Sequence, residues 1–320
     1  MENKWNYIDD KKLIADTLEI IMTEKCNFSC AHCLRGDSSN KEISTEVLDA
    51  LFSKIKYFAS LQLGGGEVTL NPKLFDKLYE SLVKNDVRLS NLTFTTNGSV
   101  LSDELLTSLK RIEKYIKSCR RKGLPLTVVN PINICFSFDS FHLSEMERLG
   151  INFDKVLDNL AMYQHIFGKN ALICRIACDY DVINVGRAKK LNDVRKVGFL
   201  TDYTYHICEL SGGIYLGGLF CISTDGKFVL PNTPFNEESN YTIGDIKTDK
   251  ISDVLSRVNT FEISDNDIDK YYQELIESMS PPSDEFDRFI EENNEIYSAL
   301  QNTINKRVKL LKEKEENIMQ

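Results

Sequence analysis

Three cysteines within eight residues are the part of this sequence best suited to chemistry. Cys26, Cys30 and Cys33 are separated by three and by two residues. Three thiolates this close together can hold one metal cluster, but a cube of four irons has four corners, so one iron is left without a cysteine. A metal with a vacant coordination position is typical of a catalytic rather than a structural site.

A zinc site is the alternative for the same run of residues. His32 stands directly before Cys33 and could complete a Cys3His set. A zinc knuckle normally offers two close pairs of ligands, and no second Cys or His pair follows at a suitable distance. The spacing therefore favours an iron-sulfur cluster, with a non-catalytic zinc-binding scaffold protein as the competing interpretation.

Length and composition indicate an ordinary globular protein. The chain has 320 residues, of which 42% are hydrophobic and 27% charged. A net charge of −9 argues against a broad nucleic-acid surface. Because no export signal and no apolar run of membrane-spanning length is present, we expect a cytoplasmic protein whose nine cysteines are thiols or metal ligands rather than disulfides.

Short apolar runs alternate with amphipathic stretches from residue 18 to residue 210. This alternation predicts repeated strand-helix units around a parallel sheet, and six units suit a partial (β/α)6 TIM-like barrel of the α/β class. Plausible helix N-caps are Ser44, Asn71, Ser102 and Asn184. The expected strands are 18–23, 60–64, 91–96, 132–138, 171–178 and 202–209, and the expected helices are 44–58, 72–84, 102–121, 153–167 and 184–196.

Glycine and polar residues gather where the expected strands end. Glycines let a backbone approach a ligand closely, and an adjacent carboxylate can receive an ammonium group. Reactive groups of such barrels collect at the carboxyl ends of the strands. Glycine runs and Asn-Gly steps are also ordinary turn signals. The residues are Gly65, Gly66 and Glu67 on the second strand, Thr96 and Asn97 on the third, Ser137 and Asp139 on the fourth, and Arg175 on the fifth.

The cysteine spacing, the Gly65-Gly66-Glu67 step and the strand end at Ser137 and Asp139 together resemble the radical S-adenosylmethionine (SAM) enzymes. The proline that usually follows the Gly-Gly-Glu step is replaced by Val68. The resemblance implies one 4Fe-4S cluster on the three cysteines, with SAM bound at the open iron by the strand-end residues. It further implies that reductive cleavage of SAM gives a 5′-deoxyadenosyl radical, with flavodoxin or ferredoxin as the electron donor.

The chain after residue 210 predicts two further parts. Residues 211–280 contain glycine-rich turns that favour a small β-hairpin region, which resembles a degenerate SPASM or twitch extension without a second cluster. Residues 281–320 form one long predicted helix with an apolar stripe. The stripe favours packing on the protein's own core and leaves a homodimer contact open. Residues 1–17 form an N-terminal segment before the barrel at 18–210.

The substrate and the catalytic groups are predicted less specifically. The degenerate extension favours a ribosomal peptide as substrate, with a small molecule or a nucleotide as the alternative. His142 lies at the expected rim of the barrel and is a candidate for acting on the substrate, although a lone histidine there is more often a satisfied polar residue. A reaction that needs a hydrogen donor could draw on the thiols of Cys135, Cys178, Cys208 or Cys221.

Overall fold

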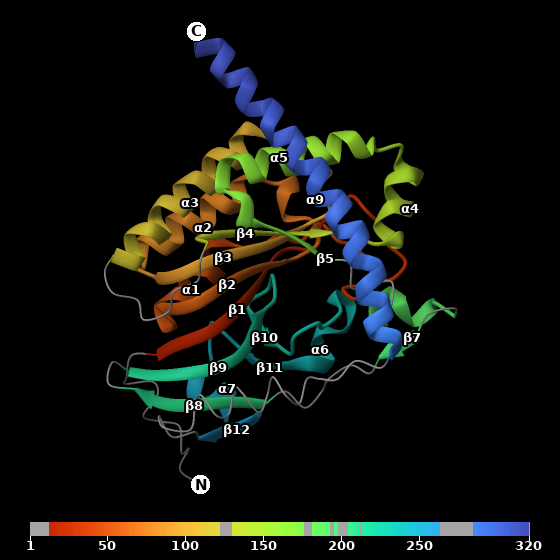
Figure 1. Ribbon diagram of the computed structural model, residues 1–320. Coiled ribbons are helices and arrows are strands. Elements are labelled where there is room, and N and C mark those ends of the chain that lie inside the picture. Colours follow the sequence, from red (N-terminus) through yellow and green to blue (C-terminus); the bar gives the residue numbers. More distant parts are fainter. Residues whose placement is uncertain are drawn as a thin grey trace.

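A mostly parallel sheet forms the centre of the computed structural model (Figure 1). The structure describes residues 13–121, 130–175, 181–192, 195–197, 204–210, 213–262 and 284–319. Five strands follow one another in sequence order and pair in parallel. They are β1 (Leu13–Thr23), β2 (Tyr57–Gly65), β3 (Arg88–Thr96), β4 (Ile132–Ser137) and β5 (Leu172–Arg175).

Helices cover one face of this sheet (Figure 1). Four of them confirm predicted helices, namely α1 (Thr45–Lys54), α2 (Lys73–Lys84), α3 (Asp103–Arg121) and α5 (Phe153–Phe167). Ser44 is the N-cap of α1, where its side chain accepts a hydrogen bond from the Val47 N–H group. A further helix that the sequence analysis missed, α4 (Ser140–Leu149), follows β4 directly. Short 3-10 turns are η2 (Val68–Leu70) and η3 (Lys169–Ala171).

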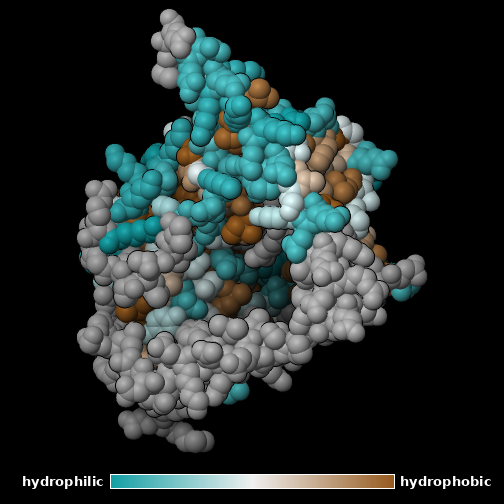
Figure 2. Space-filling model, viewed as in Figure 1, coloured by the Kyte–Doolittle hydropathy of each residue, from teal (hydrophilic) through white to brown (hydrophobic). Residues whose placement is uncertain are grey.

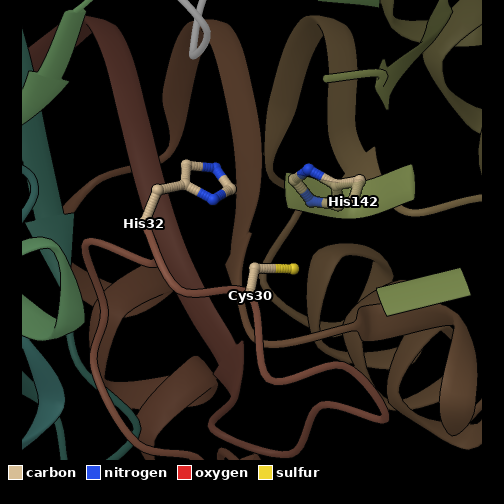
Figure 3. A group of neighbouring side chains, drawn as sticks. All are labelled: Cys30, His32 and His142. Carbon is tan, nitrogen blue, oxygen red and sulfur yellow. The ribbon is translucent and has the colours of Figure 1, made fainter. Parts of the chain in front are cut away.

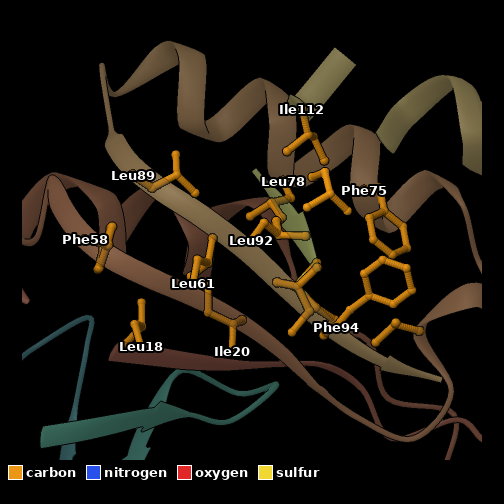
Figure 4. Close-up of a cluster of buried hydrophobic side chains, with 14 of the residues drawn as sticks. Leu18, Ile20, Phe58, Leu61, Phe75, Leu78, Leu89, Leu92, Phe94 and Ile112 are labelled. Carbon is orange, nitrogen blue, oxygen red and sulfur yellow. The ribbon is translucent and has the colours of Figure 1, made fainter. Parts of the chain in front are cut away.

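The hydrophobic core lies between the sheet and these helices (Figure 4). Alternate strand residues point into it, because successive side chains of a strand face opposite sides. Leu18 and Ile20 of β1, for example, are fully buried there. The same alternation places the residues between them on the opposite, concave face of the sheet. The labelled core members are Leu18, Ile20, Phe58, Leu61, Phe75, Leu78, Leu89, Leu92, Phe94 and Ile112.

The predicted α/β class is confirmed, but the place of the sixth barrel strand was wrong. The expected strand 202–209 is β8 (Thr204–Leu210), and it pairs with β9 (Gly213–Ile222) in an antiparallel hairpin rather than with β5. In turn, β9 pairs in parallel with β1. Because only two residues separate β8 from β9, the local hairpin is the favoured pairing, and the strand joins the sheet on the β1 side. The predicted hairpin region after residue 210 therefore extends the barrel sheet.

The remaining part of the extension completes the sheet on this side. The 3-10 turn η6 (Phe235–Glu237) and the helices α6 (Glu238–Tyr241) and α7 (Ile251–Leu255) connect its strands. The strands are β10 (Lys227–Val229), β11 (Thr242–Asp245) and β12 (Asn259–Glu262).

The helix expected at 184–196 was also wrong. The structure has β6 (Asp181–Ile183), the 3-10 turn η5 (Gly186–Lys190) and β7 (Arg195–Val197), and the two strands pair with each other. Gly186 has a φ of +56°, which is outside the right-handed helical region. A Cβ atom at this position would meet the Cys33 carbonyl oxygen at 2.5 Å, so the chain turns here to pack on the cysteine run.

The long C-terminal helix α9 (Asp284–Met319) crosses α5, and its last turns extend beyond the body of the protein (Figure 1). Leu300 and Ile304 are buried in the main core, which confirms the predicted packing of this helix on the protein itself. A dimer contact through α9 stays a prediction. Among the described helices, none has the length and apolar character needed to cross a membrane.

Candidate functional site

The three cysteines lie in one loop that follows β1. Hydrogen bonds shape this loop from within: the Cys33 N–H group donates to the Cys30 carbonyl at 3.1 Å, and the Phe28 N–H group donates to Cys26 Sγ at 3.4 Å. Cys30 is buried, whereas Cys26 and Cys33 are partly exposed. The loop thus presents several sulfur atoms at the carboxyl end of the central strand.

The electrostatics of the loop fit a cationic metal cluster. Burial raises the pKa of Cys26 to about 11. Burial also raises the pKa of Cys30, and the neighbouring Cys33 and Cys26 thiols add to the effect. Thiolates this crowded need a compensating positive charge, which iron ions supply, and the thiolate is the form that binds a metal.

The glycines of the Gly-Gly-Glu step lie against the segment that leads into the cysteine loop. The Gly66 N–H group donates to the Thr23 carbonyl at 2.8 Å, and the Glu67 N–H group donates to the Lys25 carbonyl at 2.7 Å. A Cβ atom would meet the Thr23 oxygen at 2.1 Å from Gly65 and the Lys25 oxygen at 2.0 Å from Gly66. The close backbone approach predicted for these glycines therefore includes the chain itself, while their contact with SAM stays a prediction.

Glu67 connects the ends of β2 and β3. Its side chain is 2% exposed, and one carboxylate oxygen accepts hydrogen bonds from Thr69 Oγ1 at 2.7 Å and Thr96 Oγ1 at 2.9 Å. The other oxygen accepts from the Asn97 N–H group at 2.7 Å. Burial nevertheless raises the pKa of Glu67. The buried Glu67 carboxyl group lies beside the segment that leads into the cysteine loop and is held by Thr96 and Asn97. Contact of these three residues with SAM stays a prediction.

A ring of amide and hydroxyl groups ties the cysteine loop to the end of β3. Asn97 Nδ2 donates to Asn27 Oδ1 at 3.0 Å, Asn27 Nδ2 donates to Ser99 Oγ at 2.9 Å, and Ser99 Oγ donates to Asn97 Oδ1 at 2.6 Å. Of these three residues, Asn97 was predicted from the sequence, whereas Asn27 and Ser99 were not. The position of Asn27 inside the cysteine run was the available signal. The ring fixes the loop relative to the strand ends.

The fourth strand end brings the Asp139 carboxylate and His142 to His32 of the cysteine loop. Figure 3 shows Cys30, His32 and His142 as neighbours. Asp139 is buried and caps α4, accepting hydrogen bonds from the His142 N–H group at 2.9 Å and from His142 Nδ1 at 2.7 Å. His32 Nε2 lies 3.7 Å from the same carboxylate. Burial would raise the pKa of Asp139, but the hydrogen bond and charge of His142, with His32 nearby, outweigh burial and lower it. Donor atoms of Cys30, His32 and His142 lie within 4.8 Å of one another.

Two charged residues that the sequence analysis missed hold the loop from outside. Glu145 of α4 accepts a hydrogen bond from the Ser29 N–H group at 2.6 Å. The Glu145 carboxylate also accepts hydrogen bonds from Nε and Nη2 of Arg148, each at 2.8 Å. Arg187 of η5 donates from Nε to the Cys30 carbonyl at 2.9 Å and from its backbone N–H group to the Cys33 carbonyl at 3.0 Å. No local motif marks these contacts, because both partners lie more than 100 residues away.

The remaining candidates are spread over the sheet. Ser137 ends β4 and pairs in register with Arg175 of β5, whose side chain lies outside the described residues, as does Cys178. Cys135 is buried in β4 opposite Thr95. Cys208 is buried beside Ile14, at the start of β1, nine residues or about 30 Å of strand before the site.

Cys221 lies on β9 opposite Glu19 of β1. Its thiol is fully buried, and burial raises its pKa well above the usual value. Beside it, the buried Arg35 guanidinium group forms an ion pair with Glu19 at 2.6 Å. Cys221 is therefore four strand residues away from Thr23, closer to the cysteine loop than Cys208 is.

A polar row crosses the concave face of the sheet below the site. Strand register places Glu19, Gln62, Thr93 and Asn133 side by side, each between residues that point into the helix-side core. Above this row Thr95 is exposed although it lies within the sheet. Figure 2 shows a hollow near the centre of one face of the molecule, with hydrophilic and hydrophobic residues inside it. A barrel interior is normally filled with branched apolar side chains, so a polar, open face indicates a binding surface.

The parallel sheet and the cysteine loop at its carboxyl edge define an α/β protein with a candidate metal centre. Residues 20–176 match the family model described as the Radical SAM superfamily. The chain belongs to this superfamily, whose members use a 4Fe-4S cluster and SAM. The matched range contains the three cysteines, the Gly-Gly-Glu step and the His142 helix.

Curated relatives share part of the chain. A GTP 3′,8-cyclase from Clostridium perfringens (strain SM101 / Type A) is 27% identical over 206 residues, which cover 56% of this chain and 59% of the relative. A probable GTP 3′,8-cyclase from Sulfurisphaera tokodaii is 33% identical over 91 residues, which cover 27% of this chain and 28% of the relative. The chain thus spans between about a quarter and three fifths of the length of these relatives.

Two solved structures are also similar. The Streptococcus suis protein SuiB bound to the precursor peptide SuiA has a TM-score of 0.46 and 12% identity, over 76% of this chain and 64% of that one. The protein anSMEcpe with bound AdoMet and the Cp18Cys peptide has a TM-score of 0.38 and 13% identity, over 75% of this chain and 80% of that one. Similarity at this level does not identify a substrate.

Proposed function

We propose that this protein is a radical SAM enzyme that removes a hydrogen atom from a peptide substrate. When bound, the cluster and SAM together supply an electron and the 5′-deoxyadenosyl radical that performs this step. The observation that carries the proposal is the cysteine loop, with Cys26, Cys30 and Cys33 held at the carboxyl end of β1 inside a matched Radical SAM domain. A flavodoxin-like or ferredoxin-like protein is the proposed electron donor.

The protein's own residues have two tasks in this proposal. Gly66, Asn97 and Arg187 hold the cysteine loop through the hydrogen bonds described above. Glu67, Ser137, Asp139 and Arg175 are the proposed groups for orienting SAM. A buried carboxylate such as Glu67 offers a favourable partner for the ammonium group of SAM, because charge-assisted hydrogen bonds are strong where water is excluded.

The concave face supports a peptide as the substrate. Gln62, Thr93 and Asn133 offer amide and hydroxyl groups, which match the N–H and C=O groups of a peptide backbone. Glu19, the charged member of the same row, is already paired with Arg35. A triphosphate would instead call for several Lys or Arg side chains.

A nucleotide is the second candidate substrate, because the curated relatives named above are GTP 3′,8-cyclases. The two candidates are separated by which substrate is turned over. Reconstituted protein with dithionite and SAM is incubated with GTP or with peptides encoded beside this gene, and 5′-deoxyadenosine is measured with the mass of each substrate. Turnover of a peptide supports the proposal, and turnover of GTP alone refutes the peptide assignment.

The radical assignment itself has a separate test. Anaerobically purified protein is analysed for iron, sulfide and zinc, and the Cys30→Ala variant is assayed for SAM cleavage. Iron and sulfide in the parent protein and no 5′-deoxyadenosine from the variant are expected. Zinc without sulfide, together with no SAM cleavage after reconstitution with iron and sulfide, would support the scaffold alternative. Cleavage by the variant would refute the ligand assignment.

A further inference from the structure

Cys30, His32 and His142 form a second set of metal ligands that overlaps the cluster site (Figure 3). Each offers one ligand atom, and the three atoms lie within 4.8 Å of one another. Thiolate and imidazole are the ligands that zinc prefers, with bonds of about 2.0 to 2.3 Å. Ligand atoms around one tetrahedral ion are then about 3.3 to 3.6 Å apart. A limited closing movement of the three side chains would therefore bring these atoms onto a single ion.

The carboxylate of Asp139 orients one of these ligands as metal sites require. Its Oδ2 atom lies 2.7 Å from His142 Nδ1, and the His142 backbone N–H group donates to its Oδ1 atom. A carboxylate accepts hydrogen bonds, so Nδ1 of His142 carries the proton and Nε2 keeps its lone pair for a metal. Histidine ligands of zinc usually donate their other ring N–H group to a carboxylate, a backbone carbonyl or water, as His142 does here.

The surroundings of the set also limit water. His32 stacks on Phe141 with ring centroids 4.6 Å apart, and Phe28 lies 6.3 Å from the His142 ring. Cys30 and Phe28 are buried. Metal-ligand bonds are favoured in such a shell, because the ligands have little competing hydration and their rings are held in place.

We propose that the cluster-free protein binds one zinc-type divalent ion through Cys30, His32 and His142. This goes beyond the proposed function, because two of these ligands have no part in holding the cluster. Three protein ligands leave one position of the ion for water. Because Cys30 is common to both sets, the ion and the cluster exclude each other, and zinc keeps the protein in a form that cannot take up iron and sulfide.

The two ligand sets make opposite predictions for point variants, which gives the experiment. Cluster-free protein is titrated with Zn²⁺ by calorimetry, and Co²⁺ is added in parallel to observe the sulfur-to-metal charge-transfer band and the tetrahedral ligand-field bands. One ion per chain is expected. Cys26→Ala and Cys33→Ala are expected to retain Zn²⁺ binding while losing the cluster, whereas His142→Ala and His32→Ala are expected to lose at least about tenfold in Zn²⁺ affinity.

The outcomes separate this proposal from the proposed function. Loss of Zn²⁺ binding in Cys26→Ala or Cys33→Ala equal to the loss in Cys30→Ala would overturn it in favour of a three-cysteine site. The absence of Zn²⁺ binding by the parent protein would overturn it outright. These readings use cluster-free protein, so they stand whether or not SAM is cleaved. Circular dichroism checks the fold of each variant, and if His142→Ala fails to fold, His32→Ala decides.

Discussion

Replacing Gly66 by alanine tests how the cysteine loop is positioned. A Cβ atom at this residue would lie 2.0 Å from the Lys25 carbonyl oxygen and 3.1 Å from the Cys26 nitrogen. Both neighbours are backbone atoms, so no side chain can turn away to relieve the clash. The loop must move, which breaks the hydrogen bond from the Gly66 N–H group to Thr23 and strains the one from Glu67 to Lys25.

The cost follows from these contacts. Overpacking against a rigid neighbour costs about 1 to 3 kcal/mol, and the loss of one or two backbone hydrogen bonds adds about 1 to 2 kcal/mol. We therefore expect the free energy of unfolding to fall by about 2 to 5 kcal/mol. Because the displaced backbone leads directly into Cys26, reconstitution should also yield far less bound iron and sulfide.

The assay combines urea unfolding of the cluster-free protein with iron and sulfide analysis after anaerobic reconstitution. Gly150→Ala is the matched control, because Gly150 has a φ of +65° but no atom within 4 Å of the added Cβ. Its left-handed backbone should cost about 1 to 2 kcal/mol without changing the cluster content. A Gly66→Ala variant with normal stability and a full cluster would refute this account of the glycine.

Three further predictions concern contacts that the sequence did not reveal. Glu145→Ala leaves the Ser29 N–H group without its partner. Iron should therefore leave reconstituted Glu145→Ala faster than reconstituted Arg148→Ala, with the rate of iron loss measured by a chelator. Equal rates in the two variants would contradict the role of Glu145. Ile304→Ala should lower the free energy of unfolding by about 2 to 5 kcal/mol because Ile304 is fully buried. Ile296→Ala should change the free energy of unfolding little, because Ile296 is 47% exposed. Similar losses in the two variants would place α9 away from the core. Hydrogen bonds from Lys84 and Ser81 lower the pKa of Asp49 from 3.8, so its contribution to stability is present above pH 3.8 and is lost as the pH falls through the folded pKa. In acid, the free energy of unfolding of Asp49→Asn should therefore fall less steeply with pH than that of the parent protein. Identical slopes of unfolding free energy against pH for the two proteins would argue against this contribution.

Much of the barrel could be predicted from local sequence patterns. Apolar residues at the period of a strand or of a helix located β1 to β4 and the helices α1, α2, α3 and α5. They do so because each element buries one face, which gives its own segment of sequence a periodic apolar pattern. The place of β8 could not be found in this way, since pairing with β9 or with β5 buries the same side chains. The helix α4 was missed because only its N-cap, Asp139, was recognised, and it was read as a strand end.

The sequence by itself determined which atoms can bind a metal. Cys26, Cys30 and Cys33 are separated by so few residues that any fold of this loop keeps them together. Tertiary structure alone decided what surrounds them: Glu145 and Arg187 reach the loop from 116 and 157 residues away. His142 likewise joins Cys30 and His32 only because β4 ends beside β1's loop at the carboxyl edge of the sheet. Spacing along the chain fixes local ligands, whereas charge, orientation and exclusion of water depend on contacts that only the strand order creates.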